Sequence, residues 1–161
     1  MVDKQRVLDY IAPKTAKFEG FMPKVYKCPA GFDTIGYGRN IEANPLKPYE
    51  LAQLNADGSV SQEVALQWLK EELGRCFDKA FENYNWFRNL DTERAGAVVD
   101  MIYNLGFNGF AGFRNTIGFI ATQDYKRAVA NLQQSKWWGQ VKTRAVAIAD
   151  ILENGDKATK C

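Results

Sequence analysis

The sequence contains no histidine among its 161 residues. Without imidazole, catalytic relays of the Ser-His-Asp or Cys-His type and zinc sites with histidine ligands are excluded. Histidine is the side chain whose ordinary pKa lies close to neutrality. Proton transfer near neutral pH therefore falls to carboxyl, thiol, amine or phenol groups.

Cysteine is scarce as well. The three cysteines, Cys28, Cys76 and Cys161, are widely spaced and form no CxxC pair of the metal-binding type. Because their number is odd and no disulfide framework is indicated, we expect reduced thiols in a protein of the cytosol.

Long apolar runs are also missing. No run approaches the roughly 20 residues that a membrane-spanning helix requires. The first seven residues contain no apolar core of signal-peptide length. We therefore expect neither a stable membrane anchor nor a secretion signal.

Charge is nearly balanced, with 21 basic and 19 acidic residues and a net charge of +2. Residues 1–40 carry a net +3, residues 41–100 a net −5 and residues 101–161 a net +4. Two basic ends around an acidic middle could favour an anionic polymer, but an excess this small is typical of an ordinary solvated surface. Nucleic acid is therefore not an expected partner.

Hydrophobic periodicity predicts a chain that is mainly helical. Pro13 is expected to separate two N-terminal helices, and Ser61 to cap a long one. Glycine-rich turns are expected at Gly106, Gly109 and Gly112. The predicted helices cover residues 3–11, 13–19, 47–54, 61–83, 113–121, 124–134 and 142–153, with one more that begins at Asp91 or Thr92.

A short β-rich stretch lies near the N-terminus. Residues 24–28 and 34–38 read as strands joined by a turn at 29–33. If this hairpin closes symmetrically about Gly31, Cys28 and Thr34 are directly opposite, with their side chains about 5 Å apart on one face. The expected fold class is α+β, mainly α. One domain of two lobes is expected, with a small lobe at about 14–60, a connecting helix at 61–83 and a helical lobe at 84–161 plus the N-terminal helix.

One spacing pattern combines residues of different chemistry. Cys28 follows Glu19 by nine positions, Thr34 follows Cys28 by six, and Ile35-Gly36-Tyr37-Gly38 comes next. Singly, each has an ordinary explanation as a solvated carboxylate, a small buried thiol or a strand residue. Together they resemble the catalytic signature of the phage lysozymes of the T-even type, glycoside hydrolase family 24, except that the family's aspartate is Cys28 here. Residues 105–115 and 130–145 resemble later blocks of that family, so the resemblance covers about residues 14–155.

The resemblance implies a two-lobed lysozyme-like fold and hydrolysis of the β-1,4 bond between N-acetylmuramic acid and N-acetylglucosamine in bacterial peptidoglycan. Glu19 would be the general acid, Thr34 would hold a water molecule, and Arg144 would lie beside the catalytic glutamate. The resemblance also places substrate contacts along a groove, at Gly38, Asn40, Tyr103, Asn104, Thr116, Asn131 and Arg144. Trp137 and Trp138 are expected to pack in the core rather than to hold sugar.

Three roles are open for Cys28. As a thiolate it could act as a base or electrostatic stabiliser, which keeps an inverting reaction. It could instead attack the sugar and form a covalent intermediate, which gives retention. It could also be inert, with Glu19 and Thr34 sufficient for turnover.

Two further positions depart from the well-known family members. Phe18 replaces an acidic residue beside the catalytic glutamate, which makes that neighbourhood less anionic. Arg39 stands in place of a histidine that pairs with an acid on the long helix. We expect Arg39 to pair with Glu71 or Glu72.

The resemblance implies an endolysin for host cell lysis, monomeric and without cofactor or metal. It would accumulate in the host cytoplasm and reach the cell wall after a separate protein opens the membrane. Its partners would be the glycan strands of peptidoglycan. The alternative is a wall-binding module or virion component with the same fold and no turnover, because fold alone does not establish activity.

Overall fold

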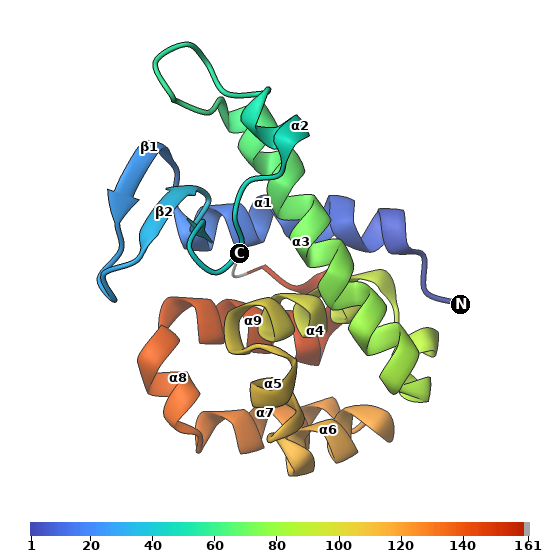
Figure 1. The fold of residues 1–161 in the computed structure, drawn as a ribbon. Helices are drawn as coiled ribbons and strands as arrows, with labels where there is room; N and C mark the ends of the chain where they lie inside the picture. The colour runs from blue at the N-terminus through green and yellow to red at the C-terminus, as the bar shows by residue number, and fades with distance from the viewer. Residues whose placement is uncertain (160–161) are drawn as a thin grey trace. The chain divides into compact units, whose positions relative to one another are not determined.

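A computed structural model describes residues 1–159, so Cys161, expected to be a reduced thiol, lies outside the described residues. The chain is mainly helical with one small antiparallel sheet, which confirms the predicted α+β class. The strands are β1 (Met22–Lys27), β2 (Asp33–Gly36) and β3 (Arg39–Asn40). The helices are α1 (Lys4–Glu19), α2 (Pro48–Leu51), α3 (Gln62–Asn83), α4 (Thr92–Leu105), α5 (Phe107–Ala111), α6 (Arg114–Ala121), α7 (Tyr125–Gln133), α8 (Lys136–Val141) and α9 (Thr143–Asn154), with 3₁₀ turns η1 (Asn85–Asn89) and η2 (Gly155–Lys157) (Figure 1).

Contacts divide the chain into two compact units. The sheet unit comprises residues 12–72, and the helical unit comprises residues 1–11 and 73–159. Helices α1 and α3 each contribute residues to both units.

The sheet unit is built on three antiparallel strands in the order β1-β2-β3. Tyr26 pairs with Thr34 and Lys27 with Asp33, and a register irregularity lies between Met22 and Tyr26. The expected pairing of Cys28 with Thr34 is therefore wrong, because β1 ends one residue earlier and Cys28 belongs to the turn. The core of the unit consists of Ile35, Val60, Ala65 and Trp68, against which Phe21, Tyr37, Ile41, Leu46, Leu54 and Val64 pack.

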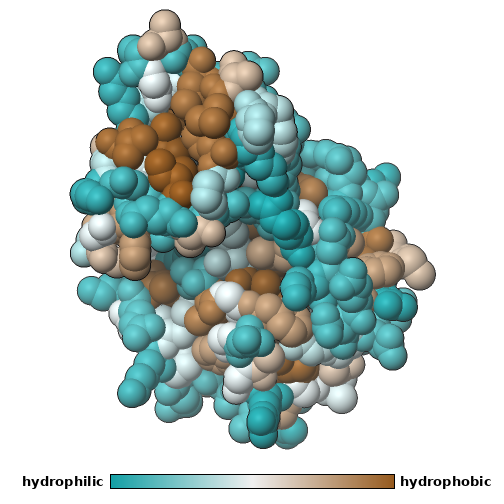
Figure 2. Space-filling view, in the orientation of Figure 1, coloured by the Kyte–Doolittle hydropathy of each residue, from teal (hydrophilic) through white to brown (hydrophobic). Residues whose placement is uncertain are grey.

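Apolar side chains also lie on the surface of the sheet unit. In Figure 2 they gather in the upper part of the view, where Figure 1 places the sheet and α2. The exposed large hydrophobic residues of this unit are Met22, Val25, Phe32, Tyr49 and Leu51.

The helical unit is organised around α4, whose residues from Ala95 to Ile102 are all buried. Helix α4 packs against α9, and α6 packs against α7. The predicted start of α4 is confirmed, with Asp91 as the N-cap that accepts a hydrogen bond from the N–H of Arg94. The predicted cap of α3 is also confirmed, because the hydroxyl of Ser61 accepts a hydrogen bond from the N–H of Val64 at 3.1 Å.

Three helix predictions need correction. Pro13 does not divide the N-terminal segment, since α1 runs unbroken from Lys4 to Glu19. Proline removes one backbone hydrogen bond, but the burial of Ile11, Ala12 and Ala16 on both sides of Pro13 favours a continuous helix. The turns expected at Gly106 to Gly112 contain the short helix α5, in which Phe110 is fully buried. Helix α8 lies where no separate helix was expected, and Ser135 caps it.

Candidate active site

Glu19 is the last residue of α1 and is half-buried. The helix stops there because Gly20 adopts a left-handed φ of 74°, while its N–H still donates to the carbonyl of Ala16 at 3.0 Å. The backbone of Gly38 lies directly against the Glu19 carboxylate. Gly38 has a left-handed φ of 75°, which favours glycine, and a Cβ atom there would make a close contact of 3.3 Å with Oε1 of Glu19.

Thr34 lies on β2 and is only 3% exposed. Its hydroxyl donates a hydrogen bond to the carbonyl of Phe32 at 2.9 Å. Across the sheet it pairs with Tyr26 on β1 and Asn40 on β3. The hydroxyl is therefore held at the inner end of the hairpin turn.

Cys28 occupies the turn between β1 and β2. Its N–H donates to the carbonyl of Phe32 at 3.0 Å, and its carbonyl accepts from the N–H of Gly31 at 2.7 Å, which closes the turn around the side chain. The left-handed φ of 88° at Gly31 permits this closure.

The turn lowers the pKa of the Cys28 thiol. The largest cause is a hydrogen bond from the backbone N–H of Phe32 to the sulfur, which partial burial opposes. The Thr34 hydroxyl and the N–H groups of Ala30 and Gly31 add smaller contributions in the same direction. Cys28 and Thr34 are thus brought together through the turn and not through strand register.

Arg39, next to Gly38, is the centre of a buried polar network. It is 5% exposed, and its Nη2 donates to Oε1 of Glu50 at 2.9 Å while Nη1 donates to Oε2. Its Nε and Nη2 also donate to the backbone carbonyls of Asn44 and Pro45. The predicted partner Glu72 is confirmed at 3.8 Å from Nε.

The main partner of Arg39, Glu50, was missed by the sequence analysis. Glu50 is 1% exposed on the four-residue helix α2, too short for hydrophobic periodicity to indicate a buried position. The only local signal was Pro48 at the start of this helix. Burial raises the pKa of Glu50, but hydrogen bonds from Arg39 and from the N–H of Lys47 outweigh it, so the net pKa is lowered.

The side chain of Asn40, a predicted substrate contact, is used in hydrogen bonds to the backbone. Its side-chain oxygen accepts hydrogen bonds from the N–H groups of Glu42 and Ala43, both at 3.0 Å. It thereby holds the turn that leaves β3.

The remaining predicted contacts belong to the helical unit. The Thr116 hydroxyl donates to Oδ1 of Asn131 at 2.6 Å, and Thr116 is fully buried. Thr116 therefore has no exposed surface for the direct substrate contact that was predicted. Tyr103 is half-buried on α4, and the neighbouring Asn104 is exposed and accepts a hydrogen bond from Nε1 of Trp137 at 2.7 Å.

The sequence analysis also made predictions for Trp137, Trp138 and Arg144 in the helical unit. Trp137 is 2% exposed, which confirms its expected place in the core, and Trp138 is half-buried. Arg144 is 8% exposed and binds Asp100 through two hydrogen bonds, Nε to Oδ2 at 3.0 Å and Nη2 to Oδ1 at 2.9 Å. Asp100 is fully buried and was not predicted, although its place between Val99 and Met101 in an apolar run was a signal that could have found it.

Within residues 1–159, no three Cys, Asp or Glu side chains gather in a way that would hold a metal ion. The same part of the chain contains no helix that is both long and apolar enough to cross a membrane. The chemistry that the sheet unit offers is that of a carboxyl group, a thiol of lowered pKa and a hydroxyl group.

A small three-stranded antiparallel sheet in a mainly helical chain is consistent with a lysozyme-like fold. Residues 16–148 match the family described as Phage lysozyme. The chain therefore belongs to the phage lysozyme family.

Individual relatives are distant. The chain is 26% identical over 154 residues to a probable T4-type lysozyme 2 of Dictyostelium discoideum, covering 85% of this chain and 89% of that protein. It is 25% identical over 154 residues to the pre-baseplate central spike protein Gp5 of Enterobacteria phage T4, covering 86% of this chain and 26% of that protein. It is 24% identical over 144 residues to the peptidoglycan hydrolase gp36 of Pseudomonas phage phiKMV, covering 89% of this chain and 15% of that protein.

Proposed function

We propose that this protein is an N-acetylmuramidase that hydrolyses the β-1,4 bond between N-acetylmuramic acid and N-acetylglucosamine in bacterial peptidoglycan. Family membership supports peptidoglycan as the substrate, and a relative is named a peptidoglycan hydrolase. The observation that carries the proposal is the Glu19 carboxylate seated on Gly38 in the same unit as the Cys28–Thr34 turn.

In the proposed reaction, the Glu19 carboxyl group donates its proton to the glycosidic oxygen as the bond to the anomeric carbon breaks. A water molecule held by the Thr34 hydroxyl attacks that carbon. The Cys28 thiolate accepts the proton that the water loses. Before the next turnover the Cys28 thiol returns this proton to solvent and Glu19 takes one from solvent, which restores both groups. Gly38 leaves room for the carboxylate.

The lowered pKa of Cys28 supports the base or stabiliser role over the inert one, because the turn favours the charged form of the thiol. The same thiolate could act as a nucleophile, and the anomeric configuration of the first-formed product separates the two. Inversion agrees with the base role, and retention with a glycosyl-thioether intermediate.

Cys28→Ala and Cys28→Asp test the role further. A base role predicts that alanine loses activity about a hundredfold and that aspartate keeps most of it. Cys76→Ala, at a half-buried position on α3, is the matched control and keeps full activity. Full activity of Cys28→Ala would make the thiol inert.

The first experiment measures muropeptide release from purified peptidoglycan by wild type and Glu19→Gln. The substitution keeps the shape and removes the proton donor, so activity falls about a thousandfold. Glu82→Gln, an exposed carboxyl group on α3, is the control and is fully active. If wild type releases no muropeptides, the muramidase proposal is wrong.

We assign the biological role as a monomeric endolysin that acts on the host cell wall after the membrane is opened. Expression with and without a membrane-permeabilising agent tests this role, since lysis is expected only with the agent.

A second candidate is a virion component that binds the wall without turnover. It is favoured by the match to a central spike protein of a phage, of which this chain covers 26%. Co-sedimentation with peptidoglycan in the absence of muropeptide release would support this candidate.

A further inference from the structure

Two aromatic residues are next in sequence to glycines near Glu19, since Gly20 follows Glu19 in the chain and Gly38 lies close to its carboxylate. Phe21 follows Gly20, and Tyr37 precedes Gly38. Their ring centroids are 5.2 Å apart with the planes inclined at 51°. This ring contact joins the turn that leaves α1 to the segment on which the carboxylate rests.

The backbone fixes one side of this contact, because Ile35 on β2 pairs with Arg39 on β3 across the turn that contains Tyr37 and Gly38. Gly20 and Gly38 both have a left-handed φ, of 74° and 75°. Glycine has the widest choice of backbone conformations, so a side-chain contact between the two segments adds to the order that the backbone hydrogen bonds provide. Arg39, through its bonds to Glu50, anchors the segment on the far side of Gly38.

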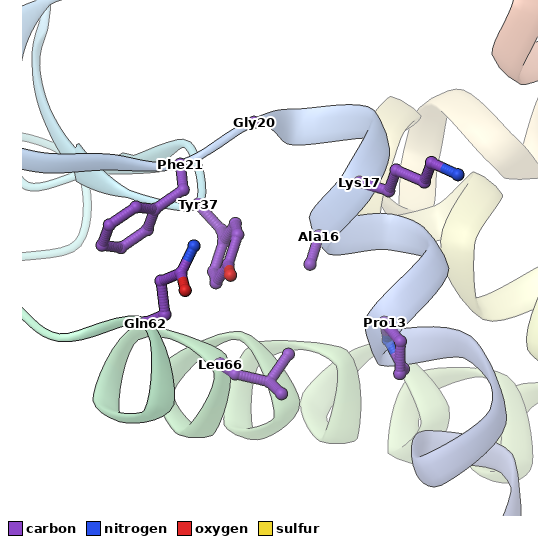
Figure 3. Close-up of a pocket in the computed structure, with 8 residues that line it drawn as sticks. All are labelled: Pro13, Ala16, Lys17, Gly20, Phe21, Tyr37, Gln62 and Leu66. Carbon is purple, nitrogen blue, oxygen red and sulfur yellow. The ribbon is translucent and has the colours of Figure 1, made fainter.

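The rings supply the anchor on the near side. Phe21 and Tyr37 pack against the core cluster of the sheet unit, which includes Ile35 and Trp68. They also line an open cavity of about 380 Å³ between the end of α1 and the start of α3. Figure 3 shows both rings projecting from the sheet side towards Gln62 and Leu66 on α3.

Because the two rings border an open cavity, their contact with each other has a large share in holding them in place. Where a side chain faces open space it has no partner atoms on that side to resist displacement. Removing one ring therefore enlarges the cavity and removes the contact that joins the Tyr37 segment to the chain that leaves α1.

We propose that Phe21 and Tyr37 are positioning residues that keep the backbone of Gly38 against the Glu19 carboxylate and so maintain the rate of turnover. This inference rests on the proposed muramidase function of Glu19. The rings act through the carboxylate and not through the sugar, so they influence kcat more than KM.

The test compares Tyr37→Ala, Tyr37→Phe and wild type with soluble peptidoglycan fragments. A displacement of about 1 Å at a reacting group costs on the order of a hundredfold in rate. We expect Tyr37→Ala to lower kcat by about 10- to 100-fold with KM within about threefold, and Tyr37→Phe, which keeps the ring, to remain within about twofold. Phe21→Ala should resemble Tyr37→Ala, and the double variant should lose little more than either, because both changes break one contact.

The matched control is Phe81→Ala. Phe81 is half-buried on α3 and stacks on Phe77 with ring centroids 5.9 Å apart. It should lose stability as a ring truncation does, while kcat stays within about twofold of wild type, and thermal unfolding verifies that each variant is folded under the assay conditions.

A folded Tyr37→Ala with wild-type kcat overturns the inference, provided that wild type is active and Glu19→Gln is not. If wild type itself is inactive, the function proposal has failed instead, and a crystal structure of Tyr37→Ala still tests the positioning. In that structure Glu19 displaced from Gly38 supports the inference, and an unchanged contact overturns it. If Tyr37→Ala does not fold, Tyr37→Leu and Phe21→Leu, which keep an apolar group of intermediate size, take its place in the same assay and crystal structure.

Discussion

Replacement of Glu50 by glutamine tests the energetics of the buried pair in the sheet unit. The side chains of Arg39 and Glu50 are 5% and 1% exposed, and the carboxylate accepts two hydrogen bonds from the guanidinium group. Glutamine keeps the shape and one acceptor but removes the negative charge. Arg39 then remains buried, with Glu72 at 3.8 Å as its nearest acidic partner.

Removal of one partner of a buried ion pair costs about 3–5 kcal/mol, since the other charge is left uncompensated. Glutamine keeps one acceptor for Arg39, and Glu72 still offers a nearby negative charge, so the cost should lie at the lower end of this range. We therefore expect a loss of about 3 kcal/mol in the free energy of unfolding. For a chain of this size that corresponds to a fall of about 6–12 °C in Tm. Circular dichroism during heating and during urea titration measures both quantities.

The control is Glu71→Gln, where the carboxylate accepts a hydrogen bond from the Tyr49 hydroxyl at 2.8 Å on the surface. It should change the free energy of unfolding by no more than about 0.5 kcal/mol. An Arg39→Met, Glu50→Gln double variant removes the uncompensated charge and should recover part of the loss. A Glu50→Gln protein within about 1 kcal/mol of wild type would refute the reasoning, because the pair would then contribute no more than a surface ion pair.

Three further predictions follow from the sheet unit. Gly38→Ala should lose activity in muropeptide release and about 1–2 kcal/mol of stability. Gly58→Ala has the same backbone strain with no atom within 4 Å, so it should lose stability only, and equal activity of the two variants would contradict the contact. The rate at which iodoacetamide alkylates Cys28 should reach half its maximum at a pH below the ordinary thiol pKa of about 8.5, because the N–H of Phe32 and the other donors favour the thiolate. Mass spectrometry over a pH series measures this midpoint, and a value at or above about 8.5 would contradict the prediction. The pKa of Glu50 is lowered in the folded state, so Glu50 stabilises the fold above its unfolded pKa of about 4.3, and this stabilisation is lost as the pH falls below that value. Glu50→Gln should therefore reduce the fall in the free energy of unfolding at acid pH. An unchanged fall would mean that other groups cause it.

Much of the local structure followed from short-range patterns. Ser61 and Asp91 cap their helices as predicted, because a capping oxygen needs only the N–H groups two or three residues ahead of it. The spacing of Glu19, Cys28 and Thr34 predicted the site residues, and family membership is now established independently of that spacing. The individual roles of those residues remain predictions.

The errors have one physical cause, which is that contacts outside the local pattern outweighed it. Pro13 was expected to end a helix, but burial of the residues around it favours a continuous one. The hairpin was expected to close about Gly31 with Cys28 in a strand, whereas the register irregularity near Met22 and the closed turn place Cys28 outside the sheet.

The sequence by itself determined the class of the fold, the start of the main helices and the order in which a carboxyl, a thiol and a hydroxyl group occur. Periodicity, capping and spacing are properties of neighbouring residues, and the chain carries them in any context. Only the tertiary structure decided that Glu50 binds Arg39, that the turn lowers the pKa of the Cys28 thiol, and that Gly38 lies close to the Glu19 carboxylate. Each of these features depends on how segments distant in the sequence pack against one another. Their packing buries polar groups, and burial strengthens the ion pairs and hydrogen bonds between them. No local sequence pattern specifies this burial.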